Sequence, residues 1–121
     1  MQVMLLFRDE GVDWSQQATD EARKAILQQV IDWTADLERR GKLVAVDGLK
    51  SGGKTVRRKG AGFVVDGPYA EGRDAVLGYY ILDVADFDEA LALAKESPHA
   101  GMGGATEIRE VMPFRKPTKA S

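Results

Sequence analysis

The first forty residues change from a continuous apolar run to a helical spacing of apolar positions. Residues 3–7 are all apolar and are followed by charged residues, which predicts a short, buried, central strand. Thr19 is a suitable helix N-cap, and Gly41 follows two arginines, so we expect a helix between them. Apolar residues at steps of three and four give this helix one buried face: Ile26, Val30, Trp33 and Leu37.

The rest of the chain alternates strand signals with one more helix. Runs of β-branched and apolar residues predict five further strands, at 43–46, 54–58, 62–65, 77–84 and 106–112. Gly60 lies between the second and third of these, which favours a hairpin. The pair Asp86 and Glu89 predicts the start of a second helix, and Pro98 predicts its end. We expect three residues on its buried face: Phe87, Leu91 and Ala94.

This order of elements predicts the fold class and an assembly. Strand, helix, strand, hairpin, strand, helix and strand match an α+β split β-α-β arrangement, with both helices on one face of an antiparallel sheet. Tyr79 and Tyr80 then point to opposite faces, so one face of the sheet needs another cover. A second copy related by a two-fold axis provides it, so we expect a homodimer with any pocket near the junction of the two sheets.

Length, charge and residue counts disfavour several classes of function for this chain. With 121 residues, the chain is expected to form a single domain over residues 1–113, followed by a C-terminal tail over residues 114–121. A formal charge of −2 disfavours direct nucleic-acid binding. There are no cysteines and one histidine, so neither a thiolate nor a zinc site is expected, nor any cofactor. Because no signal-peptide or membrane-spanning pattern is found, we expect a cytoplasmic location without membrane contact.

Two adjacent segments carry a family resemblance. Residues 65–74 read VDGPYAEGRD, and residues 77–84 read LGYYILDV. They resemble the signature of YCII-related proteins of the DGPF type. Four other segments look like family positions: 4–7, 41–44, 48–49 and 107–109. The resemblance covers nearly the whole chain and implies a ferredoxin-like fold that dimerises through its sheets, as in dimeric α/β barrels, and a bacterial source.

The resemblance implies no single reaction. Better understood YCII relatives are associated with a His and Asp pair and with lyase or dehalogenase chemistry, but the one histidine here, His99, follows the second helix, so that pair is not carried over. Tyr69 stands where Phe is usual, and Arg73-Asp74 stands where Lys-Glu is usual. Proteins of this type look like genomic neighbours of extracytoplasmic-function sigma factors, which implies a regulatory alternative.

The turn at residues 66–69 has two interpretations. Asp, Gly and Pro are residues that a tight turn needs for structural reasons alone. Alternatively, the turn holds the Asp66 carboxylate and the Tyr69 hydroxyl at the mouth of a cleft, with Glu71 and Arg73 close enough to bind a polar ligand.

Three residues outside this turn are also candidates. His99 is suited to acid or base chemistry, but after Pro98 and before a glycine-rich run it also fits an exposed loop. Arg8 ends the central strand, where it fits either a ligand carboxylate or a surface ion pair. Tyr79 fits either a ligand cleft or packing at an interface.

Two functions follow from these residues. The first is binding of a small anionic metabolite beside the sheet, with proton-transfer chemistry of a lyase or isomerase type. In it, Asp66 or His99 moves the proton, and the ligand is bound by Arg8, Tyr69, Glu71, Arg73 and Tyr79. The second is a non-catalytic regulatory module that contacts another protein, such as a sigma factor, through an exposed apolar patch.

Overall fold

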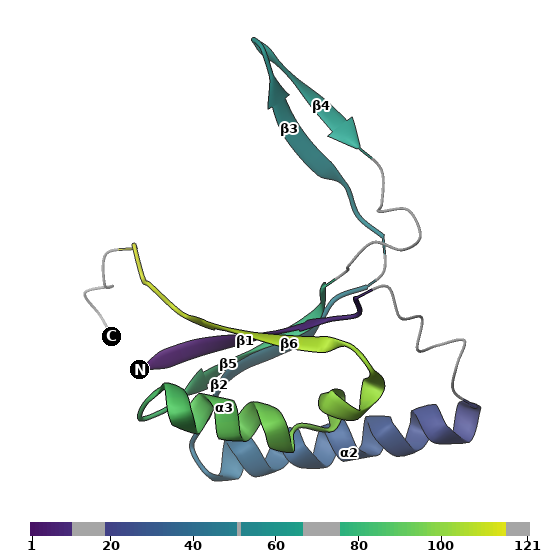
Figure 1. Ribbon diagram of the computed structural model, residues 1–121, viewed down its shortest axis with the longest axis vertical. Helices are drawn as coiled ribbons and strands as arrows, with labels where there is room; N and C mark the ends of the chain where they lie inside the picture. Colours follow the sequence, from purple (N-terminus) through teal and green to yellow (C-terminus); the bar gives the residue numbers. More distant parts are fainter. Residues whose placement is uncertain (11–18, 51, 67–75, 116–121) are drawn as a thin grey trace.

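The computed structural model describes residues 1–10, 19–50, 52–66 and 76–115. It contains a four-stranded antiparallel sheet in the order β2-β5-β1-β6 and a separate pair, β3-β4 (Figure 1). Along the chain the elements are β1 (Gln2–Arg8), α2 (Asp20–Arg39), β2 (Leu43–Gly48), β3 (Thr55–Lys59), β4 (Gly62–Asp66), β5 (Val76–Asp83), α3 (Phe87–Glu96), the 3₁₀-helix η1 (Pro98–Met102) and β6 (Ala105–Glu110). The expected order of strands and helices is confirmed.

The first strand is central, as its apolar run predicts. β1 pairs with β5 on one side and with β6 on the other, and both pairings are antiparallel. Counted without the β3-β4 pair, the four strands have the 2-3-1-4 order of a ferredoxin-like sheet. Both helices lie on one face of this sheet (Figure 1), so the expected α+β fold class is confirmed.

The long helix has the predicted ends, but its predicted face is fully buried only at Trp33 and Leu37, while Ile26 and Val30 are partly exposed. The Thr19 side chain accepts a hydrogen bond from the Ala22 amide at 3.1 Å, which caps the first turn of α2. Trp33 and Leu37 are buried against the sheet. After the helix, Gly41 has a φ of +72°, a left-handed conformation that glycine adopts without steric strain.

The second helix has the predicted cap but a different buried face. The Asp86 carboxylate accepts from the Glu89 amide at 2.8 Å, and the Glu89 carboxylate accepts from the Ala85 amide at 2.9 Å. The residues buried in α3 are Ala90, Leu93 and Ala94. The expectation for Phe87 and Leu91 was wrong, since both are about 40% exposed. The helical repeat places them at the side of the buried face and not at its centre.

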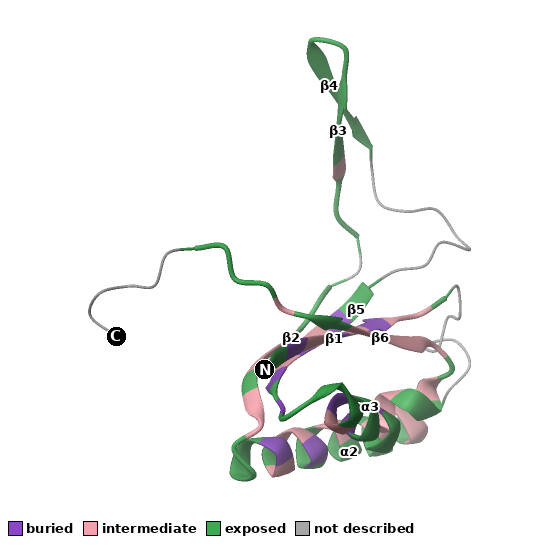
Figure 2. Ribbon diagram, turned by 60° about the vertical axis from the view of Figure 1, so that its left-hand side comes forward, coloured by how far each residue is buried: buried purple, intermediate pink, exposed green. Residues whose placement is uncertain are grey.

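The core lies entirely between the sheet and the helices. Alternate residues of β1, namely Val3, Leu5 and Phe7, point into it and are buried. Tyr80 and Leu82 of β5 are buried beside them, so the predicted opposite orientations of Tyr79 and Tyr80 are confirmed. In Figure 2 the buried positions are purple, and they fall on strands of the sheet and on the helices that pack below it.

No helix among the described residues covers the other side of the sheet (Figure 1). We call it the open face. Strand register, with the alternation along β5 for Leu77, assigns ten residues to it: Met4, Leu6, Arg8, Ala45, Asp47, Leu77, Tyr79, Ile81, Glu107 and Arg109. Most of the apolar members are only partly buried. The open face is therefore an apolar surface with charged groups on the outer strands and at the end of β1.

The predicted hairpin is present, and it stands away from the sheet. β3 and β4 pair with each other through a turn at Gly60 and Ala61, where Gly60 has a φ of +60°. We call this hairpin the arm. It projects on the side of the open face, opposite the helices (Figures 1 and 2). The proposed limits of the domain and of the C-terminal tail stay predictions.

Candidate functional site

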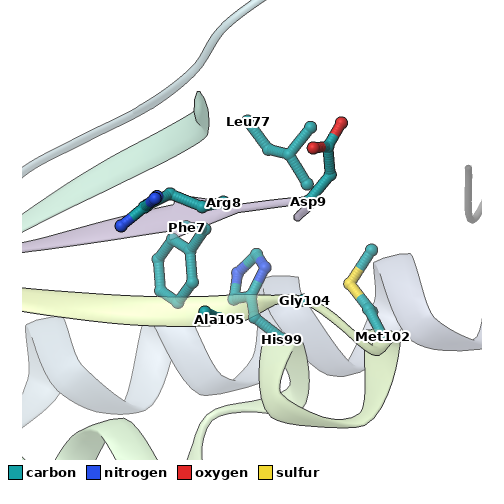
Figure 3. Close-up of a pocket in the computed structure, with 8 residues that line it drawn as sticks. All are labelled: Phe7, Arg8, Asp9, Leu77, His99, Met102, Gly104 and Ala105. Carbon is teal, nitrogen blue, oxygen red and sulfur yellow. The ribbon is translucent and has the colours of Figure 1, made fainter. Parts of the chain in front are cut away.

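A small pocket lies at the end of the sheet where β1 finishes and η1 leads into β6 (Figure 3). Its walls include Phe7, Arg8 and Asp9 from the first strand and its end, Leu77 from β5, and His99 from η1. The pocket volume is about 20 Å³, which is room for one water molecule. The pocket can therefore receive a single polar group of a ligand whose remaining atoms lie outside it.

Local hydrogen bonding and aromatic packing hold His99 at this pocket. The Ser97 hydroxyl accepts a hydrogen bond from the His99 amide at 3.1 Å and caps η1. The imidazole stacks on the Phe7 ring with centroids 4.0 Å apart, and it meets the rings of Tyr80 and Trp33 edge-on at 5.8 and 6.4 Å. The expectation of an exposed loop residue was wrong, because η1 packs against the helices and β6 and turns His99 inward.

Burial controls the protonation of His99. Its Nε2 atom is buried and has no hydrogen-bond partner within the part of the chain that the structure describes. Burial lowers the pKa of His99 below its ordinary value, so the imidazole is neutral at pH 7. A neutral imidazole has one donor and one acceptor nitrogen. An unpartnered buried nitrogen costs stability, and such atoms call for a structural or functional explanation.

Arg8 is fixed on the open-face side of the same strand end. Its guanidinium donates to Glu107 Oε1 at 2.9 Å, and Glu107 Oε2 in turn accepts from Arg109 at 3.2 Å. The Arg8 side chain is 38% exposed, so it can reach a ligand placed over the open face. The ion pair joins strands that are 99 residues apart in sequence, so local spacing could not identify Glu107 as the partner.

Tyr79 forms a second polar pair on the open face. Its hydroxyl donates to Asp47 Oδ2 at 2.9 Å, across the paired strands β5 and β2. This hydrogen bond and the negative charge of Asp47 raise the pKa of Tyr79, so the phenol keeps its proton. Sequence reasoning assigned Asp47 only to a turn. Its alternation with Ala45 along β2 was the signal that it shares the open face.

Of the remaining predicted site residues, only Asp66 is described, and it lies away from this pocket. Asp66 ends β4 and is exposed, with its carboxylate 3.4 Å from Arg57 Nε of the arm. It does not line the pocket beside His99. Tyr69, Glu71 and Arg73 lie outside the described residues, as does most of the turn that carries them.

A second, shallower groove runs between α3 and β6 and has a volume of about 260 Å³. Its lining is mostly apolar, from residues such as Leu91, Ala94 and Ile108, with the Lys95 ammonium as its charged group. Sequence reasoning did not identify this groove, because it expected Leu91 to be buried.

Among the described residues, no three His, Cys, Asp or Glu side chains are grouped closely enough to hold a metal ion. In the same parts of the chain, no helix has both the length and the apolar character needed to cross a bilayer.

Comparisons with known proteins place the chain in a family. An uncharacterized protein from Rhizobium meliloti (strain 1021) is 29% identical, over 93% of this chain and 92% of that protein. The solved structure of 5-chloro-2-hydroxyhydroquinone dehydrochlorinase from Burkholderia phenoliruptrix AC1100, in complex with 2,5-dihydroxybenzoquinone, has a similar fold, with a TM-score of 0.52 and 14% identity over 93% of this chain and 94% of that one. The family model of the YCII-related domain matches residues 1–115. The chain therefore belongs to the YCII-related family.

Proposed function

We propose that this protein binds a small planar anion at the end of the sheet where Arg8 and His99 line one pocket, and that His99 transfers a proton there. The observation that carries this proposal is the buried Nε2 atom of His99, which has no hydrogen-bond partner among the described residues, beside a pocket that Arg8 also lines. A ligand oxygen or a water molecule in that pocket would supply the missing hydrogen-bond partner.

Arg8 is the residue that binds the anion. Its planar guanidinium suits two oxygens of a carboxylate or an enolate, and Glu107 holds it in place on the open face. Because the pocket admits only a small group, the body of the ligand would lie over the apolar side chains of the open face, including Leu77. A flat ligand makes the largest contact with such a surface.

His99 is the residue that moves the proton. A neutral imidazole at pH 7 is able to accept a proton, and a pKa lowered by burial keeps it in that form. Tyr79 would position the ligand through its phenol, whose proton is retained beside Asp47. We assign no proton transfer to Asp66, because its carboxylate pairs with Arg57 on the arm.

The proposal includes a homodimer that covers the open face. The apolar strip of β1 and β5 on this face, with Leu6, Leu77 and Ile81, is of the kind that sheet-on-sheet packing buries. A second copy would exclude water from the ligand and strengthen its interaction with Arg8. The site would then be completed by the partner.

The solved relative supplies a suitable probe. Its structure holds 2,5-dihydroxybenzoquinone, a flat, acidic compound that is anionic at neutral pH. Dehydrochlorination, the reaction in its name, removes a proton and a chloride ion and therefore needs a base. These features fit the chemistry proposed for Arg8 and His99. We therefore propose planar, acidic oxygen compounds as the class of ligand.

The test uses the single histidine of the chain as a reporter. We expect addition of 2,5-dihydroxybenzoquinone to shift the imidazole NMR signals of His99, and calorimetry to give a dissociation constant. Arg8→Gln should weaken binding by about tenfold or more, since a charged hydrogen bond contributes about 1.5–3 kcal/mol. Arg109→Gln is the matched control, because Arg109 also pairs with Glu107 but does not line the pocket.

Two results would contradict the proposal. One is unchanged imidazole signals at saturating concentrations of this probe and of small aromatic carboxylates. The other is equal loss of affinity in the Arg8→Gln and Arg109→Gln variants, which would indicate nonspecific attraction to positive charge.

A further inference from the structure

The arm has one apolar face and one charged face. Directly paired residues of two antiparallel strands point to the same side, and the register pairs Val56 with Val65 and Arg58 with Phe63. These four residues share one face, while Arg57, Val64 and Lys59 share the other. We call Val56, Phe63 and Val65 the apolar face of the arm. The Arg58 guanidinium lies over the Phe63 ring, 5.8 Å from its centre, so one cation stacks on this face.

This apolar face is exposed to water in the single chain. Val56, Phe63 and Val65 are 62%, 67% and 57% exposed. The two strands pair only with each other in the described structure. An isolated two-stranded hairpin is marginally stable in water, and it gains stability when an apolar face packs against another surface. The arm therefore has the composition of a segment that docks onto a partner.

Charge favours a second copy of this chain as that partner. The arm, residues 55–66, contains three basic residues and one acidic residue, a formal charge of +2. The rest of the chain contains fourteen basic and eighteen acidic residues, a charge of −4. The arm of one copy is therefore attracted to the body of another.

The arm is long enough to reach a second copy that packs on the open face. It rises on the side of the open face (Figures 1 and 2), where a second sheet would pack about 10 Å away. Its strands have five residues each, roughly 17 Å when extended, so the arm is longer than the spacing between two packed sheets. It would reach past the partner's sheet and lie along its side.

We propose that the arm is an intersubunit clasp, whose apolar face packs on a second copy of this chain. The proposal rests on the homodimer of the proposed function, and it adds a contact outside the sheet faces. A nucleic acid is the competing partner for a basic hairpin. The apolar face favours protein instead, because phosphates would be met by the charged face that carries Arg57 and Lys59.

The first experiment measures the dimer dissociation constant of the full chain by analytical ultracentrifugation. The variant Val56→Thr/Phe63→Thr/Val65→Thr removes the apolar face of the arm but keeps residues that favour strands. It should raise the dissociation constant at least tenfold. Val64→Thr changes the same residue type on the opposite face, and it should alter the constant by less than twofold. Circular dichroism checks that both variants keep the fold.

A second experiment locates the arm in the assembly. Because the chain has no cysteine, Val65→Cys creates a unique attachment point for a benzophenone photo-crosslinker. In a mixture of ¹⁴N- and ¹⁵N-labelled protein, we expect cross-linked dimers of mixed isotope content, with peptides joined from residue 65 to the other copy. Cross-links found only within one copy would overturn the clasp.

The outcomes separate the clasp from the proposals on which it rests. If the wild type dimerises and the triple variant dimerises equally well, the clasp is wrong and the dimer stands. If the wild type is a monomer at 100 µM, the clasp and the homodimer are both wrong, while binding of the anion is tested independently through Arg8. If a 30-base-pair DNA duplex binds the wild type and loses affinity in Arg57→Gln/Lys59→Gln, while the apolar variant leaves the dimer unchanged, the arm is a nucleic-acid contact.

Discussion

At the scale of single residues, His99 shows how packing changes the chemistry of a side chain. Its ring is enclosed by Phe7, Tyr80 and Trp33, from two strands and the long helix. These rings make dispersion contacts with the imidazole, but the ring contacts do not provide a hydrogen-bond acceptor for a protonated imidazole. The Tyr80 hydroxyl is engaged by Thr34 at 2.6 Å, and burial raises the pKa of Tyr80. The aromatic surroundings of His99 therefore favour its neutral form.

This environment predicts a pH dependence of stability. The pKa of His99 is lower in the folded protein than in the unfolded chain, where it is about 6.5. The unfolded state therefore binds the proton first as the pH falls, so the contribution of neutral His99 is intact above pH 6.5 and is lost as the pH falls towards the folded pKa. Urea denaturation at pH 7.5 and 5.5 should show a larger loss of stability for the wild type than for His99→Phe. Equal losses would contradict the assignment.

At the scale of elements, local patterns predicted the architecture well. The spacing of apolar residues identified both helices and all six strands, because caps, turns and periodicity are properties of neighbouring residues. The site was harder to predict, since its contacts join distant segments: Arg8 to Glu107, and Tyr79 to Asp47. The orientation of His99 depends on how η1 packs, and no local pattern contains that information.

The close approach of β2 to β5 at Gly78 also depends on residues that are distant in the sequence. A Cβ atom placed on Gly78 would lie 2.9 Å from the Asp47 carbonyl oxygen and 3.2 Å from Gly48 Cα, and both are backbone atoms. We expect Gly78→Ala to lower the free energy of unfolding by about 1–3 kcal/mol, as overpacking does. Gly62→Ala is the control, because a Cβ there meets nothing within 4 Å. Chemical denaturation of both variants measures the difference, and equal stabilities would show that the strands move apart without cost.

At the scale of the whole molecule, the core is one-sided. The buried residues lie between the sheet and the helices, while Leu77 on the open face and Phe63 on the arm remain exposed. A second copy would bury both surfaces, and the two proposed contacts would then be formed in the same assembly step.

Such an assembly predicts that thermal stability depends on protein concentration. For a folded dimer, a hundredfold increase in concentration should raise the Tm by roughly 5 °C, because association stabilises the folded state by mass action. Ile81→Lys on the open face should abolish this dependence. Leu27→Lys, at an exposed position of α2, should preserve it. A Tm that does not vary with concentration in the wild type would contradict a homodimer.

The central position of β1 also determines when the fold can be completed during synthesis. This strand is synthesised before both of its neighbours, which are residues 76–83 and 105–110. At translation rates of about 5–20 residues per second, β1 waits roughly 5–20 s for its last partner. During that time an apolar strand has unpaired edges beside the ribosome. We infer that native pairing is completed only after the last strand emerges, so chaperones that shield nascent apolar segments should act on the first ten residues of this chain.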